Sequence, residues 1–126
     1  MAAVITKQIL AGIRLVNGGL ALAIPNVVGG RLGVSTATSP GLGYALRLFG
    51  VRTVLLGIQL WRTQPVAGNH VVQETILIHG ADTAAALVVY RLGELPRKGA
   101  MLAVGISAVN TALAVLLNWQ VRRAKP

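Results

Sequence analysis

The 126-residue sequence has no cysteine, only three acidic residues and a charged fraction of 12%. The lack of cysteine excludes a disulfide scaffold, a zinc ribbon and cysteine catalysis. A soluble globular domain usually carries about twice this charged fraction. Twelve Lys and Arg residues give a net charge of +9, but nucleic-acid binders seldom combine such an excess with so few charges overall. We therefore expect no nucleic-acid partner.

Recognisable reaction centres are missing as well. No glycine-rich loop leads into Lys-Ser or Lys-Thr, and no Gly-x-Ser-x-Gly motif is present, so neither a P-loop nor a serine nucleophile elbow is expected. His79 and Asp82 have no third ligand at a spacing suited to a metal. These absences argue against an enzyme, and we expect neither a cofactor nor a metal.

Long apolar stretches are what the sequence does contain, with a mean hydropathy of +0.67. Four of them have roughly the 20 residues that a helix needs to cross a bilayer, and glycine and proline gather in the joints between them. They span approximately residues 8–28, 44–61, 71–90 and 100–119. The pattern predicts an all-α fold, an up-down antiparallel four-helix transmembrane bundle that forms a single integral-membrane domain over residues 1–126.

Aromatic residues are few, and their positions support this division. Both tryptophans and both tyrosines fall at segment ends, where their amphipathic rings would lie at the membrane surface: Tyr44, Trp61, Tyr90 and Trp119. The fourth segment has no charge over residues 100–117, so it lacks the polar face of a helix in a soluble bundle. Both features predict a multi-pass protein of the cell membrane.

The first segment is not expected to be a cleaved signal peptide, because Arg14 and Asn17 would interrupt its apolar core. The positive-inside rule does not settle the orientation, since five basic residues fall on each side. The densest basic cluster, Arg122, Arg123 and Lys125, favours cytoplasmic termini. A dual topology stays open.

Polar residues inside the apolar segments form the candidate site. Arg52 lies near the middle of the second segment, where a charge is costly and needs a partner. Antiparallel folding at equal rise per residue brings Asp82 and Asn110 to its level, and His79 shares a helix face with Asp82. The same alignment predicts a second layer of Arg14, Gln59 and Glu74. These layers either hold the helices together or bind an ion or ligand.

Small residues spaced four apart are expected to form the helix-packing faces, since they let backbones approach closely. The pairs are Gly19 with Ala23, Gly80 with Ala84, Ser107 with Thr111, and Ala108 with Ala112.

The first half of the chain carries a recognisable pattern, Gly-Ile-Arg-Leu-Val-Asn-Gly over residues 12–18 followed by Arg-x-x-Gly-x-Arg over residues 47–52. With Asp82 in the third segment, it resembles the DUF4267-type family of small bacterial four-helix membrane proteins. The resemblance implies a bundle in a bacterial inner membrane and no assigned reaction. Relatives tend to place an acid after the second arginine, whereas this chain has Thr53, which makes Asp82 more important to Arg52.

The leading functional hypothesis is a non-enzymatic accessory or assembly subunit of a larger membrane complex. One alternative is a small transporter or channel that uses the layer of Arg52, Asp82 and His79. A second is a binder or enzyme of lipids or isoprenoids, with arginine holding an anionic headgroup. Expected partners are the bilayer, including anionic lipids, and either another membrane protein or a second copy of the chain.

Overall fold

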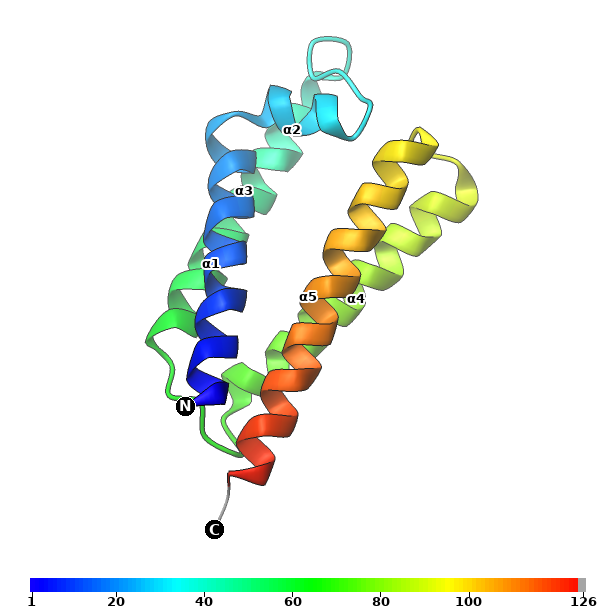
Figure 1. Cartoon of the computed structure of the whole chain (residues 1–126). Coiled ribbons are helices and arrows are strands. Elements are labelled where there is room, and N and C mark those ends of the chain that lie inside the picture. Colours follow the sequence, from blue (N-terminus) through cyan, green and yellow to red (C-terminus); the bar gives the residue numbers. More distant parts are fainter. Residues whose placement is uncertain (125–126) are drawn as a thin grey trace.

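The computed structural model describes residues 1–124 and is helical throughout, which confirms the predicted all-α class. Five helices follow one another along this part of the chain, whereas four were predicted. The four long helices alternate in direction, and the start of α1 and the end of α5 lie at the same end of the molecule (Figure 1). The helices are α1 (Ala2–Ala23), α2 (Pro25–Arg31), α3 (Pro40–Arg62), α4 (His70–Leu92) and α5 (Arg97–Arg123).

The first predicted segment, residues 8–28, is not one straight helix. α1 ends at Ala23, and α2 starts at Pro25 at an angle of 108° to it. A proline ring disfavours helical geometry in the residue before it, and Ile24 accordingly adopts φ −132° and ψ 58°. Pro25 itself sits well in the first turn of α2, where no backbone N–H donor is needed.

Local signals also set the ends of the later helices. Pro40 begins α3 in the same way. Asn69 caps α4, its side chain accepting a hydrogen bond of 2.9 Å from the Val71 backbone N–H. Gly93 ends α4 in the left-handed conformation, with φ +67°.

α1 and α3 form a closely packed antiparallel pair. A Cβ atom on Gly50 would lie 2.6 Å from the Leu22 backbone nitrogen and 2.7 Å from the Gly18 carbonyl oxygen, so only glycine fits. A Cβ atom on Gly18 would likewise lie only 2.8 Å from the Val54 backbone nitrogen. At the end of the pair, the buried ammonium group of Lys7 donates hydrogen bonds to the carbonyls of the final turn of α3, Trp61 O at 2.7 Å and Thr63 O at 3.0 Å.

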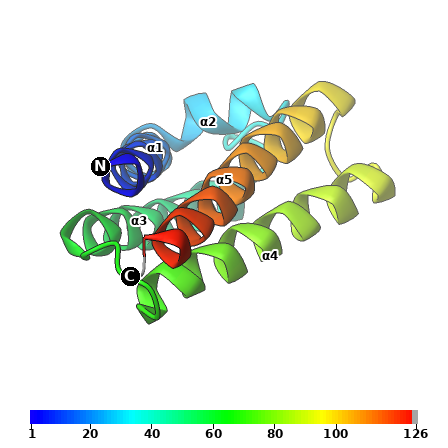
Figure 2. The same ribbon diagram turned by 60° about the horizontal axis from the view of Figure 1, so that its bottom comes forward.

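α4 and α5 form a second closely packed pair (Figure 2). The Thr83 and Thr111 hydroxyls share a hydrogen bond of 2.8 Å between the two helices. Each hydroxyl also lies within hydrogen-bonding distance of a carbonyl of its own helix, the His79 carbonyl at 2.8 Å and the Ser107 carbonyl at 2.9 Å. Because a hydroxyl has one proton, one threonine donates to its own carbonyl and accepts the bond that the other donates across the helix pair. α5 lies between α4 and α1, whereas α3 and α4 touch only sparsely.

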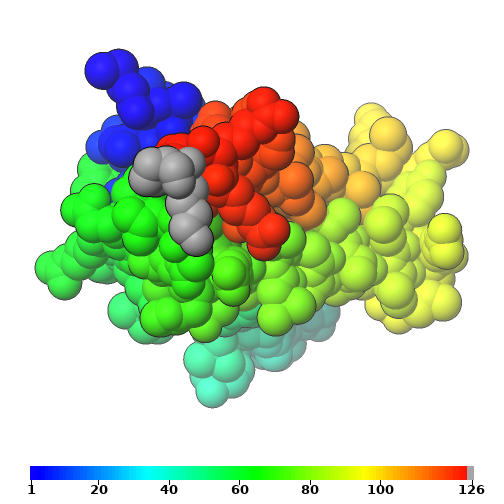
Figure 3. All heavy atoms as spheres, turned by 90° about the horizontal axis from the view of Figure 1, so that it is seen from below, coloured from blue at the N-terminus to red at the C-terminus, as the bar shows by residue number. Residues whose placement is uncertain are grey.

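The two pairs are joined at both ends. At the end with the termini, the start of α1, the α3–α4 loop and the last turns of α5 lie together (Figure 3), over a core of Leu10, Ala11, Leu60, Val72, Ala114, Leu117 and Val121. At the other end, Gly99 of α5 packs directly on the Leu32 backbone, and Pro96 lies against Gly33. The bend at Ile24 makes the second junction, because it carries α2 across toward α5.

Three helices, α3, α4 and α5, are long and apolar enough to cross a membrane, and a fourth span results if α1 and α2 count as one bent span. Only 11–22% of the residues in the apolar windows of those three helices are buried inside the protein, so most of their apolar side chains face outward. Such a large apolar surface indicates a membrane protein. The four end-of-helix aromatics are exposed as well, and Arg123 stacks on the Trp119 ring at 4.0 Å.

Candidate functional site: a polar-ended cavity between the helix pairs

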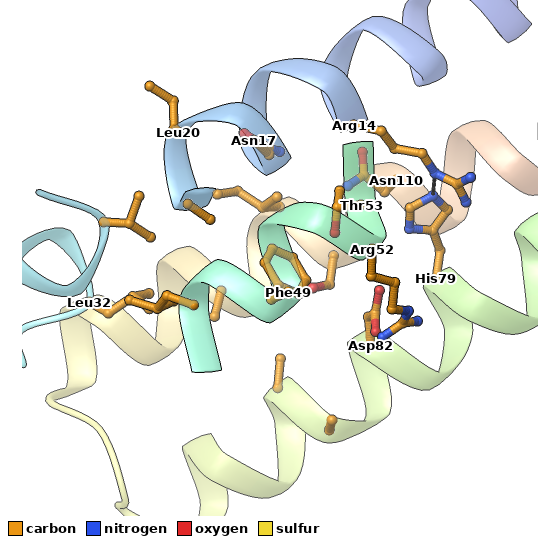
Figure 4. Close-up of a pocket in the computed structure, with 18 of the residues that line it drawn as sticks. Arg14, Asn17, Leu20, Leu32, Phe49, Arg52, Thr53, His79, Asp82 and Asn110 are labelled. Carbon is orange, nitrogen blue, oxygen red and sulfur yellow. Dashed lines mark hydrogen bonds between the residues drawn. The ribbon is translucent and has the colours of Figure 1, made fainter. Parts of the chain in front are cut away.

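A cavity of about 510 Å³ lies between the two helix pairs. All five helices contribute to its wall, which reaches from Arg14 of α1 to Leu32 after α2 (Figure 4). The volume is within the range typical of small-molecule sites. Apolar lining residues on three helices are partly exposed, Leu20 of α1 at 44%, Phe49 of α3 at 43% and Leu102 of α5 at 41%, so the cavity is open to the outside of the protein. In a membrane, these openings would face lipid.

The two ends of the cavity differ in polarity. Most of the polar lining residues lie at one level, and the wall toward α2 is mainly apolar. The polar end is lined by Arg14, Arg52, His79, Asp82 and Asn110, and the end near α2 by Leu20, Val28, Leu32, Leu46, Leu102 and Ala103, with Arg31 as its one charged residue. Figure 4 shows this separation, with Leu20 and Leu32 far from the polar group. A molecule with a polar head and an apolar tail matches such a wall.

Arg14 and His79 are joined at the polar end. Arg14 Nε donates a hydrogen bond of 2.9 Å to His79 Nε2, and both side chains are buried, at 3% and 4% exposure. Because an imidazolium has no acceptor nitrogen, this bond requires a neutral His79 with its proton on Nδ1. Arg14 Nη1 makes only a long contact of 3.4 Å to the Leu56 carbonyl, and Nη2 is buried without a partner among residues 1–124. The guanidinium charge is therefore held in place but incompletely satisfied.

Arg52 and Asp82 lie beside this pair. Figure 4 shows their side chains side by side, with no hydrogen bond drawn between them. The Asp82 carboxylate is within electrostatic range of both Arg52 and Arg14, and it is the only carboxylate among the cavity-lining residues. It compensates part, but not all, of the positive charge.

Asn110 completes the polar end from α5. Its side chain is 7% exposed, and its Oδ1 atom is buried without a hydrogen-bond partner in the described chain. Buried polar atoms are rarely left unsatisfied, so each orphan needs an explanation. Two of the unsatisfied atoms in the described chain belong to cavity-lining residues, the donor Nη2 of Arg14 and the acceptor Oδ1 of Asn110.

Of the two predicted polar layers, the structure brings the residues of the first together but not those of the second. Arg52, Asp82, His79 and Asn110 all line the cavity, as members of one layer would. The second layer does not form, because Arg14 joins His79 instead. Gln59 and Glu74 are both exposed and lie outside the cavity wall.

The sequence analysis did not identify several of the residues that line the cavity. Asn17 lies one turn from Arg14, and Phe49 one turn from Arg52, so helical spacing of three could have found both. Arg31 also lines the wall, although it was placed in a connecting segment, because the bend that carries α2 over the cavity was not foreseen.

Within residues 1–124, no three His, Asp or Glu side chains lie close enough together to hold a metal ion. Comparison with known proteins adds no assignment, since no family model, curated protein or solved structure matches the chain. The function must therefore be argued from the cavity.

Proposed function

We propose that this protein is a small, non-enzymatic protein of the bacterial inner membrane that binds an amphiphilic molecule in the cavity between its helix pairs. The observation that carries the proposal is the cavity of about 510 Å³, with Arg14, Arg52 and Asp82 at one end and mainly apolar side chains at the other. A site of this kind orients its ligand through a few polar groups and gains affinity from apolar burial.

In this proposal the chain crosses the bilayer four times as an up-down bundle, with α1 and α2 together forming the first span. The 22 residues of α1 extend for about 33 Å, which matches a hydrocarbon core of about 30 Å. α2 then lies near the membrane surface, as its angle of 108° to α1 suggests.

Both termini are proposed to be cytoplasmic. Arg122 and Arg123 at the end of α5, which belong to the densest basic cluster of the chain, support this side. Lys125, the last member of the basic cluster, lies outside the described residues. The similarity to DUF4267-type proteins also favours a bacterial membrane, and membership of that family remains a proposal.

Amphiphile binding is favoured by where the cavity is open. The core around Leu10, Leu60 and Leu117 lies between the polar end and the terminus-bearing surface. The exposed apolar lining residues Leu20, Phe49 and Leu102 instead give access from the surrounding lipid. The accessory-subunit hypothesis stays a prediction, to be tested by crosslinking and purification in mild detergent.

The test is photolabelling of the purified protein in lipid nanodiscs with a diazirine-bearing fatty acid. We expect labelled peptides from the cavity-facing turns of α3 and α5. Ala86→Phe places a ring on the cavity wall and should abolish this labelling. Ala84→Phe is the matched control, because Ala84 is exposed on the same helix and lies outside the wall. Equal labelling of both variants would refute the proposal.

A further inference from the structure

We infer that the cavity selects a single-chain amphiphile whose headgroup carries one negative charge, such as a long-chain carboxylate. This inference rests on the proposed function and adds the ligand class. Its basis is the charge that the polar end leaves uncompensated.

The charge count at the polar end is +1, and it leaves out Arg31, which lines the wall at the α2 end and is exposed. Arg14 and Arg52 contribute two positive charges and Asp82, which lies beside Arg52, contributes one negative charge. His79 adds none, because its Nε2 accepts the hydrogen bond from Arg14. Net charge is unfavourable in a membrane-embedded site of low dielectric constant, so a ligand with one negative charge makes the site neutral. A doubly charged head would leave an excess of negative charge.

The hydrogen-bonding groups favour an anion with a planar pair of oxygens. Arg14 Nη2 is buried and has no acceptor within residues 1–124. A ligand oxygen would accept the hydrogen bond that this donor lacks. Arginine matches a carboxylate especially well, because its nitrogens form a planar fork. The orphaned acceptor on Asn110 needs a donor, which a water bound beside the headgroup can supply.

The wall also indicates where the tail lies. From Arg14 to Ala21, Arg52 to Leu46 and Asn110 to Leu102, the lining covers about 9–12 Å of helix axis. One extended alkyl chain can follow this path toward α2, or pass between the exposed apolar lining residues and continue into the bilayer.

The experiment is competition against the photoreactive fatty acid in nanodiscs at about pH 8, where the carboxylate carries one negative charge and the phosphate monoester close to two. The competitors share one chain and differ in head charge: oleate, oleyl alcohol and oleyl phosphate. We expect oleate to displace the probe at about a tenfold lower concentration than either of the others.

Charge variants then test the count itself. Asp82→Asn raises the polar end to +2 and should shift the preference from oleate to oleyl phosphate. Arg52→Gln lowers it to zero and should make oleate and oleyl alcohol equivalent. The matched controls are Glu74→Gln on α4 and Arg47→Gln on α3, which change the same charges at exposed positions outside the cavity wall and should leave the preference unchanged.

The outcomes separate this inference from the proposed function. If the three competitors act equally while Ala86→Phe still blocks labelling, the amphiphile site stands and the charge selection is wrong. If Asp82→Asn and Glu74→Gln give the same order of competitors, the count at the polar end is wrong. If Ala86→Phe does not reduce labelling, both the proposed function and the inference fail.

Discussion

Gly18→Ala should lower the free energy of unfolding of the protein, because the added methyl group forces α1 and α3 apart. The added Cβ would lie 2.8 Å from the Val54 backbone nitrogen and 2.9 Å from the Gly50 carbonyl oxygen. Both atoms belong to the backbone of α3, so no side-chain rotation can make room. The neighbouring residue is a matched control, since a Cβ on Gly19 would meet nothing within 4 Å.

The magnitude follows from the difference between the two variants. Replacing glycine by alanine inside a helix gains up to about 1 kcal/mol of helix propensity at either position. Overpacking costs about 1–3 kcal/mol, and it applies at Gly18 alone. Gly18→Ala should therefore be less stable than Gly19→Ala by about 1–3 kcal/mol. The free energy of unfolding is measured by titrating the purified protein in mixed micelles with a denaturing detergent and following helix loss by circular dichroism.

Equal unfolding free energies for the two variants would refute the close α1–α3 contact. A second readout checks the cause of any loss. Arg14 lies one turn before Gly18 on α1, so separation of the helices should also reduce photolabelling of the cavity by the fatty-acid probe. Loss of stability with unchanged labelling would mean that the cavity does not depend on this contact.

Three further predictions concern the helix ends and the second pair. Lys7→Gln removes a charged donor from two carbonyls at the end of α3 and should lower the unfolding free energy by about 1–3 kcal/mol in the same micelle titration; an unchanged value would contradict the capping role. Thr83→Val and Thr111→Val should show a coupling of about 0.6 kcal/mol in a double-mutant cycle, and strict additivity would mean that their hydroxyls do not stabilise the α4–α5 pair. Because the chain has no cysteine, single cysteines can report topology. Val66→Cys should react with an impermeant maleimide from the cytoplasmic side and Ser35→Cys from the opposite side, and labelling of both from one side would exclude four spans.

The helical segments were predictable, whereas the bend was not. Apolar runs of the right length identify spans independently of tertiary contacts, and helices lie over all four predicted segments. The apolar run continues past Pro25 to Val28, which hid the break at Ile24. The rule that a residue before proline avoids helical geometry was available locally, but continuous hydropathy outweighed it.

The candidate site was predicted by comparing the positions of residues along the helix axes. This comparison shows which residues lie at the same depth in the bundle, but it does not show which side of each helix they occupy. On α4, Glu74 and His79 are five residues apart and therefore differ by about 140° around the helix axis. The alignment placed Glu74 level with Arg14, yet its side chain points outward and His79 faces Arg14. Helix rotation depends on packing, and the packing residues were also misidentified. Gly18 and Gly50 make the close contact, while the predicted Gly19 faces open space.

The cavity follows from where the backbone contacts fall. Glycine contacts bring α1 close to α3, and α5 packs along α4, so the two pairs cannot spread to share their space evenly. Between the pairs, contact is concentrated at the ends, in the apolar core near the termini and where Gly99 meets Leu32. The middle is therefore left open by backbone positions rather than by flexible side chains. A ligand needs no rearrangement of helices to occupy it, because apolar lining residues such as Leu20, Phe49 and Leu102 are already exposed at the protein surface.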